Sequence, residues 1–113
     1  MQDTIAAEVP FLLEEWGRWA RQRGLRLDYA RLRQPSDLRG GGLRAPLIAD
    51  TTALWVDQCV AAVTPQKARD ALVLRYVIRA PLRVIARELD CHHSSVQRLV
   101  DDGLHQVGEA LEG

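Results

Sequence analysis

The residues best suited to chemistry lie close together, within the stretch 81–100. Cys91, His92 and His93 are of the types that ligate zinc or serve as nucleophile and base. Adjacent residues rarely ligate one ion together, and the sequence has no Cys-x-x-Cys or His-x-x-x-His pair to support them. A cysteine nucleophile would also need an orienting group and a pocket, and the sequence indicates neither. We therefore expect no bound metal, no cofactor and no catalysis.

The same stretch has the apolar spacing of two short helices joined by a tight turn. The inward positions are Ile85, Ala86 and Leu89 on a helix expected over 82–89, and Val96 and Leu99 on a helix that starts at His92 or His93. Helices that cross closely through such a turn leave room only for a small side chain, and Ala86 meets this requirement. Asp90 takes the turn position that usually holds a left-handed glycine, a conformation that Asp tolerates better than most residues.

The outward face of this helix pair carries side chains that suit DNA. The candidate DNA-binding residues are Arg83 on the first helix and His92, His93, Ser94, Ser95, Gln97 and Arg98 on the second. Arg98 is suited to guanine and Gln97 to adenine in the major groove, whereas serines and a helix N-terminus hold phosphates. Arg83 and Arg87 would touch the DNA backbone. An ordinary helical hairpin with a solvated face is the alternative, but the spacing, the small crossing residue and the polar face together favour a DNA-binding helix-turn-helix.

Arginine is concentrated in a second region. The 113-residue chain has 15 basic and 15 acidic residues, and Lys67 is its only lysine. Between Trp16 and Arg44 the sequence places eight arginines against Asp28 and Asp37. Such a local excess attracts an anionic partner, although a solvated face or a GC-rich coding sequence also explains it. The candidates for contact with RNA, phosphate or a polymerase are Arg26, Arg31, Arg33, Arg39 and Arg44.

Hydrophobic periodicity predicts an all-α fold of about five helices, because no stretch sustains the alternation of a strand. We expect a single domain, 1–113, made of an N-terminal helix at 1–24, a basic irregular loop at 25–49, and a helical core at 50–113 with the helix-turn-helix at 81–100. The first helix places Phe11, Leu12, Trp16, Trp19 and Ala20 on one face. Pro10 favours a continuous helix that begins near Val9, and Gly24 ends it. The loop contains Gly40-Gly41-Gly42, and its sequence also allows a short helix around 29–33.

Two further helices are expected before residue 81. Asp50 caps the first, which runs to Val63. Its predicted apolar stripe is Leu54, Trp55, Cys59, Ala62 and Val63. Thr64 caps the second, with Pro65 in its first position, and this helix ends at Tyr76 or Val77. The final helix of the chain reaches Leu111, weakly interrupted by Gly103 and Gly108. All three tryptophans are expected in the core, with Trp19 or Trp55 as the candidate for an exposed protein contact.

Composition excludes several classes of protein. The chain is 47% hydrophobic and 27% charged, which is typical of a folded globular domain rather than a disordered one. No apolar run approaches the roughly 20 residues that span a bilayer, and Met1-Gln2-Asp3 lacks the layout of a signal peptide. Cys59 and Cys91 are too few for a disulfide framework. We therefore expect a cytoplasmic protein with no membrane partner.

Two motifs carry a resemblance to a known family. Leu13-Glu-Glu-Trp-Gly-Arg-Trp-Ala20 has a Trp-Gly-x-Trp-Ala core, and the stretch 72–78 is followed by Ile85-Ala-Arg-Glu-Leu89 and then by the segment 94–111. In type, order and separation these pieces resemble the lambdoid-phage late-gene antitermination protein Q family, in the branch other than lambda's own. The block 64–100 is also similar to the sigma-factor region-four domain that reads an upstream promoter element.

The resemblance implies a transcription antitermination factor. It implies binding to a DNA element near a late promoter, engagement of RNA polymerase paused with its sigma factor, and suppression of terminators by a modified RNA exit channel. The implied partners are double-stranded DNA and bacterial RNA polymerase holoenzyme, with nascent RNA and a second copy on the same DNA element as further candidates. The implied location is the cytoplasm of the bacterial host, on the nucleoid.

Two other functions fit the same residues. A dimeric repressor would use the helix-turn-helix alone, with Leu104, Val107 and Leu111 as its dimer seam. An interaction module would occupy a polymerase surface without reading DNA. Every version that reads DNA requires a bent helical pair with His93, Gln97 and Arg98 facing outward.

Overall fold

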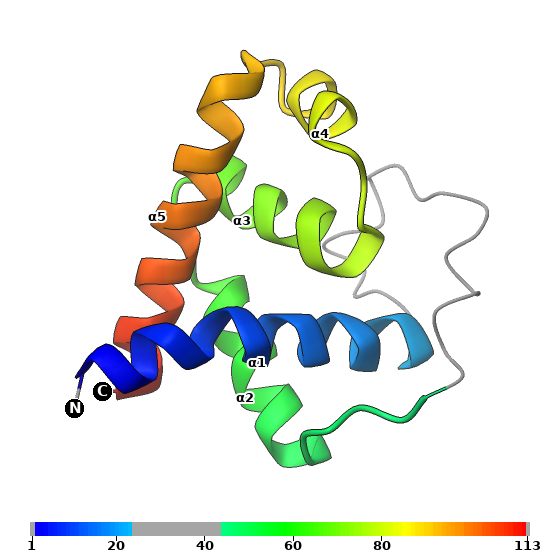
Figure 1. The fold of residues 1–113 in the computed structure, drawn as a ribbon, viewed down its shortest axis with the longest axis vertical. Helices are drawn as coiled ribbons and strands as arrows, with labels where there is room; N and C mark the ends of the chain where they lie inside the picture. The colour runs from blue at the N-terminus through cyan, green and yellow to red at the C-terminus, as the bar shows by residue number, and fades with distance from the viewer. Residues whose placement is uncertain (1, 24–43, 113) are drawn as a thin grey trace.

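The computed structural model describes residues 2–23 and 44–112, with side chains from Glu8 onward. Within these ranges the chain is all-helical and has no strand, as the periodicity predicts. The helices are α1 (Gln2–Arg23), α2 (Asp50–Ala61), α3 (Gln66–Leu72) continuing into a π-helical turn η3 (Val73–Ile78), α4 (Leu82–Glu88) and α5 (His93–Glu112) (Figure 1). Arg26, Arg31, Arg33, Arg39, Gly24, the Gly40-Gly41-Gly42 run and the short helix expected around 29–33 lie outside the described residues.

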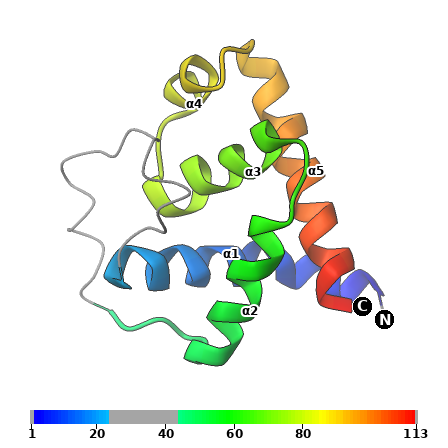
Figure 2. The same cartoon turned by 180° about the vertical axis from the view of Figure 1, so that it is seen from behind.

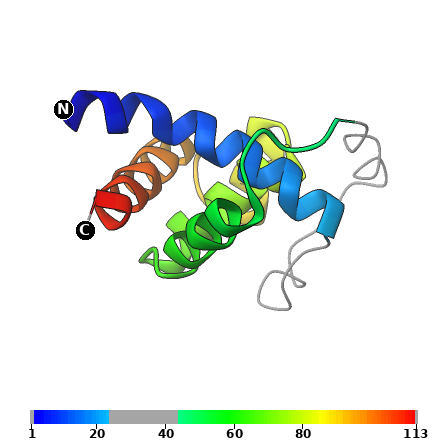
Figure 3. The ribbon, with the colours of Figure 1, turned by 90° about the horizontal axis from the view of Figure 1, so that it is seen from below.

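The helices pack around one shared core. The α3–η3 segment lies between α1 and α4, and α5 runs alongside the ends of α1 and α3 (Figures 1 and 2). Seen from below, α2 crosses α1 on the side away from α4 (Figure 3). The start of α1 and the end of α5 lie side by side. No helix in the described ranges is long and apolar enough to cross a membrane.

The first helix buries a different face from the predicted one and starts earlier. Its core residues are Val9, Leu13, Trp16 and Ala20, each at most 4% exposed, whereas Phe11 is 48% exposed and Trp19 is half-buried. The prediction of a start near Val9 is wrong, because α1 runs through Pro10 from Gln2. Pro10 removes one backbone donor. The buried Val9 and Leu13 on either side of it keep the helix axis in place.

The α2 predictions are also partly wrong. The N-cap position is Ala49, and the Asp50 carboxylate instead accepts hydrogen bonds from Trp19 Nε1 at 3.2 Å and from Arg23 at 2.7 Å. The helix ends at Ala61 rather than Val63. Its buried positions are Ala53, Val56, Asp57, Cys59 and Val60. Leu54 and Trp55, expected in the core, are each 49% exposed, and Ala62 is exposed as well. α2 is therefore turned so that the face carrying Leu54 and Trp55 meets solvent.

The backbone of Thr64 bonds to a side chain of α5, and Thr64 does not cap α3. Its backbone N–H donates to Gln106 Oε1 at 3.0 Å, and its carbonyl accepts from Gln106 Nε2. Pro65 occupies the N-cap position, so that α3 begins one residue later than predicted, at Gln66. The helix then widens into η3 and extends to Ile78 instead of ending at Tyr76 or Val77.

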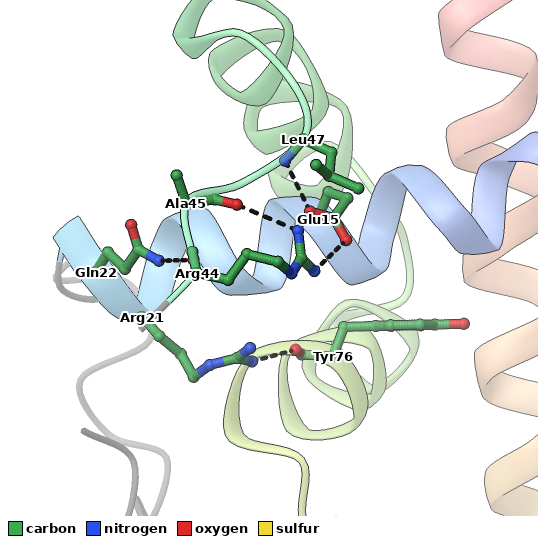
Figure 4. Close-up of polar contacts among 7 residues, drawn as sticks. All are labelled: Glu15, Arg21, Gln22, Arg44, Ala45, Leu47 and Tyr76. Carbon is green, nitrogen blue, oxygen red and sulfur yellow. Dashed lines mark hydrogen bonds and ion pairs between the residues drawn. The ribbon is translucent and has the colours of Figure 1, made fainter. Parts of the chain in front are cut away.

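The crossing of α1 with η3 is the tightest contact in the fold. A Cβ on Gly17 would lie 2.1 Å from the carbonyl oxygen of Tyr76, so that only glycine fits there. Arg21 Nη1 donates to the carbonyls of Tyr76 and Val77 at 3.0 and 3.1 Å, and thereby satisfies groups at the end of the π-helical turn (Figure 4 draws the Tyr76 bond). On the opposite side, Trp16 Nε1 donates to the buried Asp57 at 3.1 Å. The Trp-Gly-x-Trp-Ala motif is thus a packing motif in this protein.

The two glycines expected to interrupt α5 leave the helix continuous. Gly103 lies against the fully buried Leu72, and Gly108 lies against Val9, so both allow close helix packing. Val107 is fully buried, and Leu104 and Leu111 pack against the chain's own core. Val107 is therefore not available to the dimer seam considered for a repressor, and Leu104 and Leu111 are only partly exposed.

Candidate nucleic-acid interface

The α4–α5 pair is bent at the turn 89–92, as the apolar spacing predicts. Ile85, Ala86, Leu89 and Val96 are buried, and Leu99 packs against them. Asp90 adopts the expected left-handed conformation, with φ 53°. The backbone N–H of Cys91 donates to the carbonyl of Ala86 at 3.0 Å and closes the turn. The buried side of the pair fixes which side chains point outward.

The start of α5 presents a polar edge at the top of the molecule (Figure 1). Most predicted residues are exposed there: His92, His93, Ser94, Gln97 and Arg98. Ser95 differs from the expectation because it is half-buried. Ser95 lies on the flank of the helix, between the buried Val96 and the solvent face, and this position accounts for its intermediate exposure. The edge therefore offers two rings, one serine hydroxyl, one amide and one guanidinium to a partner.

His92 has a local role that the sequence did not indicate. It is the residue before α5, where its carbonyl accepts the Ser95 N–H at 2.9 Å and its ring Nδ1 accepts the Ser94 N–H at 3.2 Å. This acceptor role requires an unprotonated Nδ1 and makes the ring an N-cap. Ser94 Oγ lies 2.9 Å from the same nitrogen, and the ring of His93 lies 4.3 Å from that of His92. The two histidines are thus held at the helix start.

The arginines near this edge and the Gln97 amide differ in their hydrogen bonding within the fold. Gln97 Nε2 donates to Asp101 at 2.8 Å, so that the amide has one of its two N–H donors engaged and keeps the other, together with its oxygen, for a base. Arg98 is exposed and has no hydrogen bond or ion pair with any residue the structure describes. Arg83 and Arg87 are exposed too, and they are one turn apart on α4. Three guanidinium groups are therefore available to an anion.

Arg44, the one described member of the second candidate set, is engaged within the fold (Figure 4). Its guanidinium makes a two-pronged bond to Glu15, with distances of 3.2 and 3.0 Å. The backbone N–H of Leu47 adds a third bond to Glu15, and Gln22 Nε2 donates to the Arg44 carbonyl at 2.8 Å. The hydrogen bond from Arg44 is the main cause that lowers the pKa of Glu15, against the opposing effect of burial. We call this group of four residues the Glu15 clasp.

The Glu15 clasp fastens the chain that leads into α2 onto α1. The sequence did contain a signal for this contact, because Glu15 lies within the apolar stripe of the first helix and a buried acid requires a partner. The clasp also neutralises the Arg44 charge, which leaves Arg44 less suited to hold a phosphate than the sequence predicts.

The two cysteines lie apart from any ligand cluster. Cys59 is buried, and burial raises the pKa of its thiol, whereas Cys91 is half-buried. Among residues 2–23 and 44–112 no group of three His, Cys, Asp or Glu side chains is placed to hold a metal ion. The residues around Cys91 therefore serve the turn and the helix start.

Fold and edge together define a small all-helical protein that displays a polar helix start on a buried helical pair. The family model for phage antitermination protein Q matches residues 7–112. The chain therefore belongs to the phage antitermination protein Q family, a regulatory kind of protein rather than an enzyme family, and the family expected from the sequence is confirmed. No curated protein and no solved structure matches the chain.

Proposed function

We propose that the chain binds duplex DNA through α4, the turn and the start of α5, and uses this contact to load onto RNA polymerase. In this proposal the first turns of α5 enter the major groove. Arg98 and Gln97 contact bases, while Arg83, Ser94 and Ser95 hold the backbone, and His92 and His93 lie where the helix meets the phosphates. The protein then travels with the polymerase and modifies the RNA exit channel of the enzyme, so that the polymerase reads through terminators.

The observation that carries the proposal is that the side chains of Arg98 and Arg83 make no hydrogen bond or ion pair with the residues that the structure describes. Both side chains are exposed on adjacent helices that are buried on their other side. An arginine that makes no contact within the fold keeps all its donors for a planar, negatively charged partner. A duplex backbone with a guanine edge supplies both a phosphate and a base acceptor.

A second contact, with the polymerase, follows from charge. A protein with no formal net charge has little general attraction for DNA, so its affinity must come partly from another partner. Trp55 and Leu54, each 49% exposed on α2, lie on the far side of the fold from α4 and suit an apolar protein surface. The arginines between residues 24 and 43 remain the candidates for nascent RNA or a polymerase surface.

The test is purified transcription from a late-type promoter followed by a terminator, with the polymerase holoenzyme and with or without the protein. Wild-type protein should raise the readthrough product. Arg98→Ala should lose most of this effect at unchanged thermal stability, because the exposed side chain makes no hydrogen bond or ion pair with the residues that the structure describes. Lys67→Ala, an exposed cation at the start of α3, is the matched control and should behave as wild type.

The same assay separates the competing functions. A repressor would lower transcription upstream of the terminator as well. An interaction module would act equally well with Arg98→Ala, because it ignores DNA. Either result would contradict the proposal.

A further inference from the structure

Arg79 adopts a left-handed backbone conformation, which a glycine would adopt more easily than an arginine. It ends η3 with φ 61° and ψ 40°, in the left-handed region. Within the described ranges only Arg79 and Asp90 combine a positive φ with a side chain. Glycine is the usual residue at such a helix end, and Asp and Asn tolerate it better than long side chains do. A strained conformation retained by a large residue indicates that its side chain has a use.

The Arg79 side chain has no structural partner to explain it. It is exposed and makes no hydrogen bond or ion pair with residues that the structure describes. Its backbone N–H donates to the carbonyl of Leu74, so the residue itself is firmly placed. The backbone of Arg79 is thus fixed, and its exposed guanidinium keeps its donors for an anion.

Arg21 adds a second positive charge beside it. Arg21 is anchored by the carbonyls of Tyr76 and Val77, which precede Arg79 in the chain. Burial lowers the pKa of Arg21 most, and the charge of Arg79 lowers it further, so the two guanidinium groups feel each other. Arg18 also lowers the pKa of Arg21, and the opposing effects of Glu14 and Glu15 are smaller than those of the two arginines. A bound anion would relieve the repulsion between Arg21 and Arg79.

The position of Arg79 favours duplex DNA as the source of that anion. The connector 79–81 leads directly into α4 (Figures 1 and 2), whose exposed Arg83 and Arg87 lie beside the proposed reading edge. Arg21 is bonded to the end of η3, Arg79 follows η3, and Arg83 and Arg87 lie on α4, so the four arginines come from successive elements between the end of α1 and the helix pair. A DNA backbone that leaves the major-groove contact can continue along these elements.

We infer that Arg79, supported by Arg21, binds a backbone phosphate of the DNA duplex at a point outside the helix-turn-helix. This inference rests on the proposed function. The site contributes affinity without sequence preference, because phosphates carry no base information. It extends the DNA footprint from the start of α5 toward α1.

The test measures binding of the full chain to a labelled mixed-sequence duplex of about 30 base pairs over a range of salt concentrations. Arg79→Gly removes the charge and the backbone strain together. We expect its affinity to fall about 5- to 10-fold near 0.1 M salt, and the slope of log K against log salt to become shallower by about one. Its thermal midpoint should equal or exceed that of wild type, which a purely structural role would not allow. Arg79→Lys should keep most of the affinity.

The controls distinguish this inference from the proposed function. Lys67→Ala removes an exposed cation elsewhere and should leave the slope unchanged. Selection from a randomised duplex library should return the same DNA sequence for Arg79→Gly as for wild type, and a different or weaker preference for Arg98→Ala. If Arg79→Gly loses stability, Arg79→Asn, which tolerates the left-handed conformation, gives the same test.

Three results would overturn the inference. An unchanged salt slope for Arg79→Gly and Arg79→Asn would do so while leaving the proposed function standing, provided that Arg98→Ala still alters selection. Loss of affinity for single-stranded RNA with duplex binding unchanged would assign the site to RNA instead. Failure of wild-type protein to bind any duplex would overturn both the inference and the DNA part of the proposed function.

Discussion

Polar side chains at the crossing of α1 with η3 bond within the fold, whereas most of those at the start of α5 face solvent. At the crossing, Arg21 and Trp16 both donate to acceptors within the fold. At the start of α5, Arg98 and its neighbours face solvent on top of an equally well buried apolar side. The crossing therefore uses these polar groups mainly to stabilise the fold, whereas the α5 edge leaves most of its polar groups available to a partner. Substitutions at the crossing should change folding, and substitutions at the α5 edge should change binding.

Gly17→Ala should have the largest effect. The new Cβ would lie 2.1 Å from the Tyr76 carbonyl oxygen, a backbone atom that cannot rotate away, so that α1 must separate from η3. We expect a loss of at least about 3 kcal/mol of unfolding free energy, or at least about 12 °C in Tm. Chemical denaturation followed by circular dichroism measures this.

Gly108→Ala is the matched control within another helix. Its Cβ would meet Val9 at 3.4 Å, which is ordinary contact, and alanine favours a helix by up to about 1 kcal/mol. We expect unchanged or slightly higher stability. Equal losses for the two variants would mean that close approach at Gly17 does not determine the stability of the crossing.

The contrast between these regions also explains what the sequence could predict. The bent α4–α5 pair follows from local spacing, and even the left-handed Asp90 could be predicted, because a tight turn has one dominant requirement. The faces of α1 and α2 could not, because neighbouring apolar residues such as Leu54 and Val56 fit a helical stripe equally well. Only packing against other helices decides which of them is buried.

The polar partners inside the fold were hidden for a different reason. Glu15 bonds to Arg44, which is 29 residues away, and Trp16 bonds to Asp57, which is 41 residues away. The position of Glu15 within an apolar stripe indicates that it needs a partner, but a single sequence does not indicate which distant residue supplies it. The Arg79 conformation was hidden likewise, because it depends on the π-helical end of η3.

Glu15→Gln should have an intermediate, pH-dependent effect. The pKa of Glu15 is held below its usual value of 4.5, mainly by the hydrogen bond from Arg44. The carboxylate therefore stabilises the fold above about pH 4.5, and this contribution is lost as the pH falls through the lowered pKa. At neutral pH we expect Glu15→Gln to cost about 1 to 2 kcal/mol, because Arg44 and Leu47 lose a charged acceptor.

The comparison with wild type across pH checks the mechanism. The stability difference between the two proteins should shrink below pH 4.5, where wild type also loses the charge. Glu14→Gln, at the neighbouring exposed position, should cost little at any pH. A difference for Glu15→Gln that stays constant into acid would show that the carboxylate charge is not what holds the Glu15 clasp together.

Changes at His92 should have the smallest effect on folding and separate stability from binding most clearly. His92→Ala removes the ring acceptor of the Ser94 N–H and should cost about 1 kcal/mol. His92→Asp supplies a stronger cap and a negative charge that favours the helix N-terminus, so its stability should match or exceed wild type. The same charge would face the DNA phosphates in the proposed complex, and we expect duplex affinity to fall several-fold. Thermal melting and duplex binding, measured on both variants, test whether the start of α5 lies against the duplex. A stable His92→Asp protein that binds DNA as tightly as wild type does would mean that it does not.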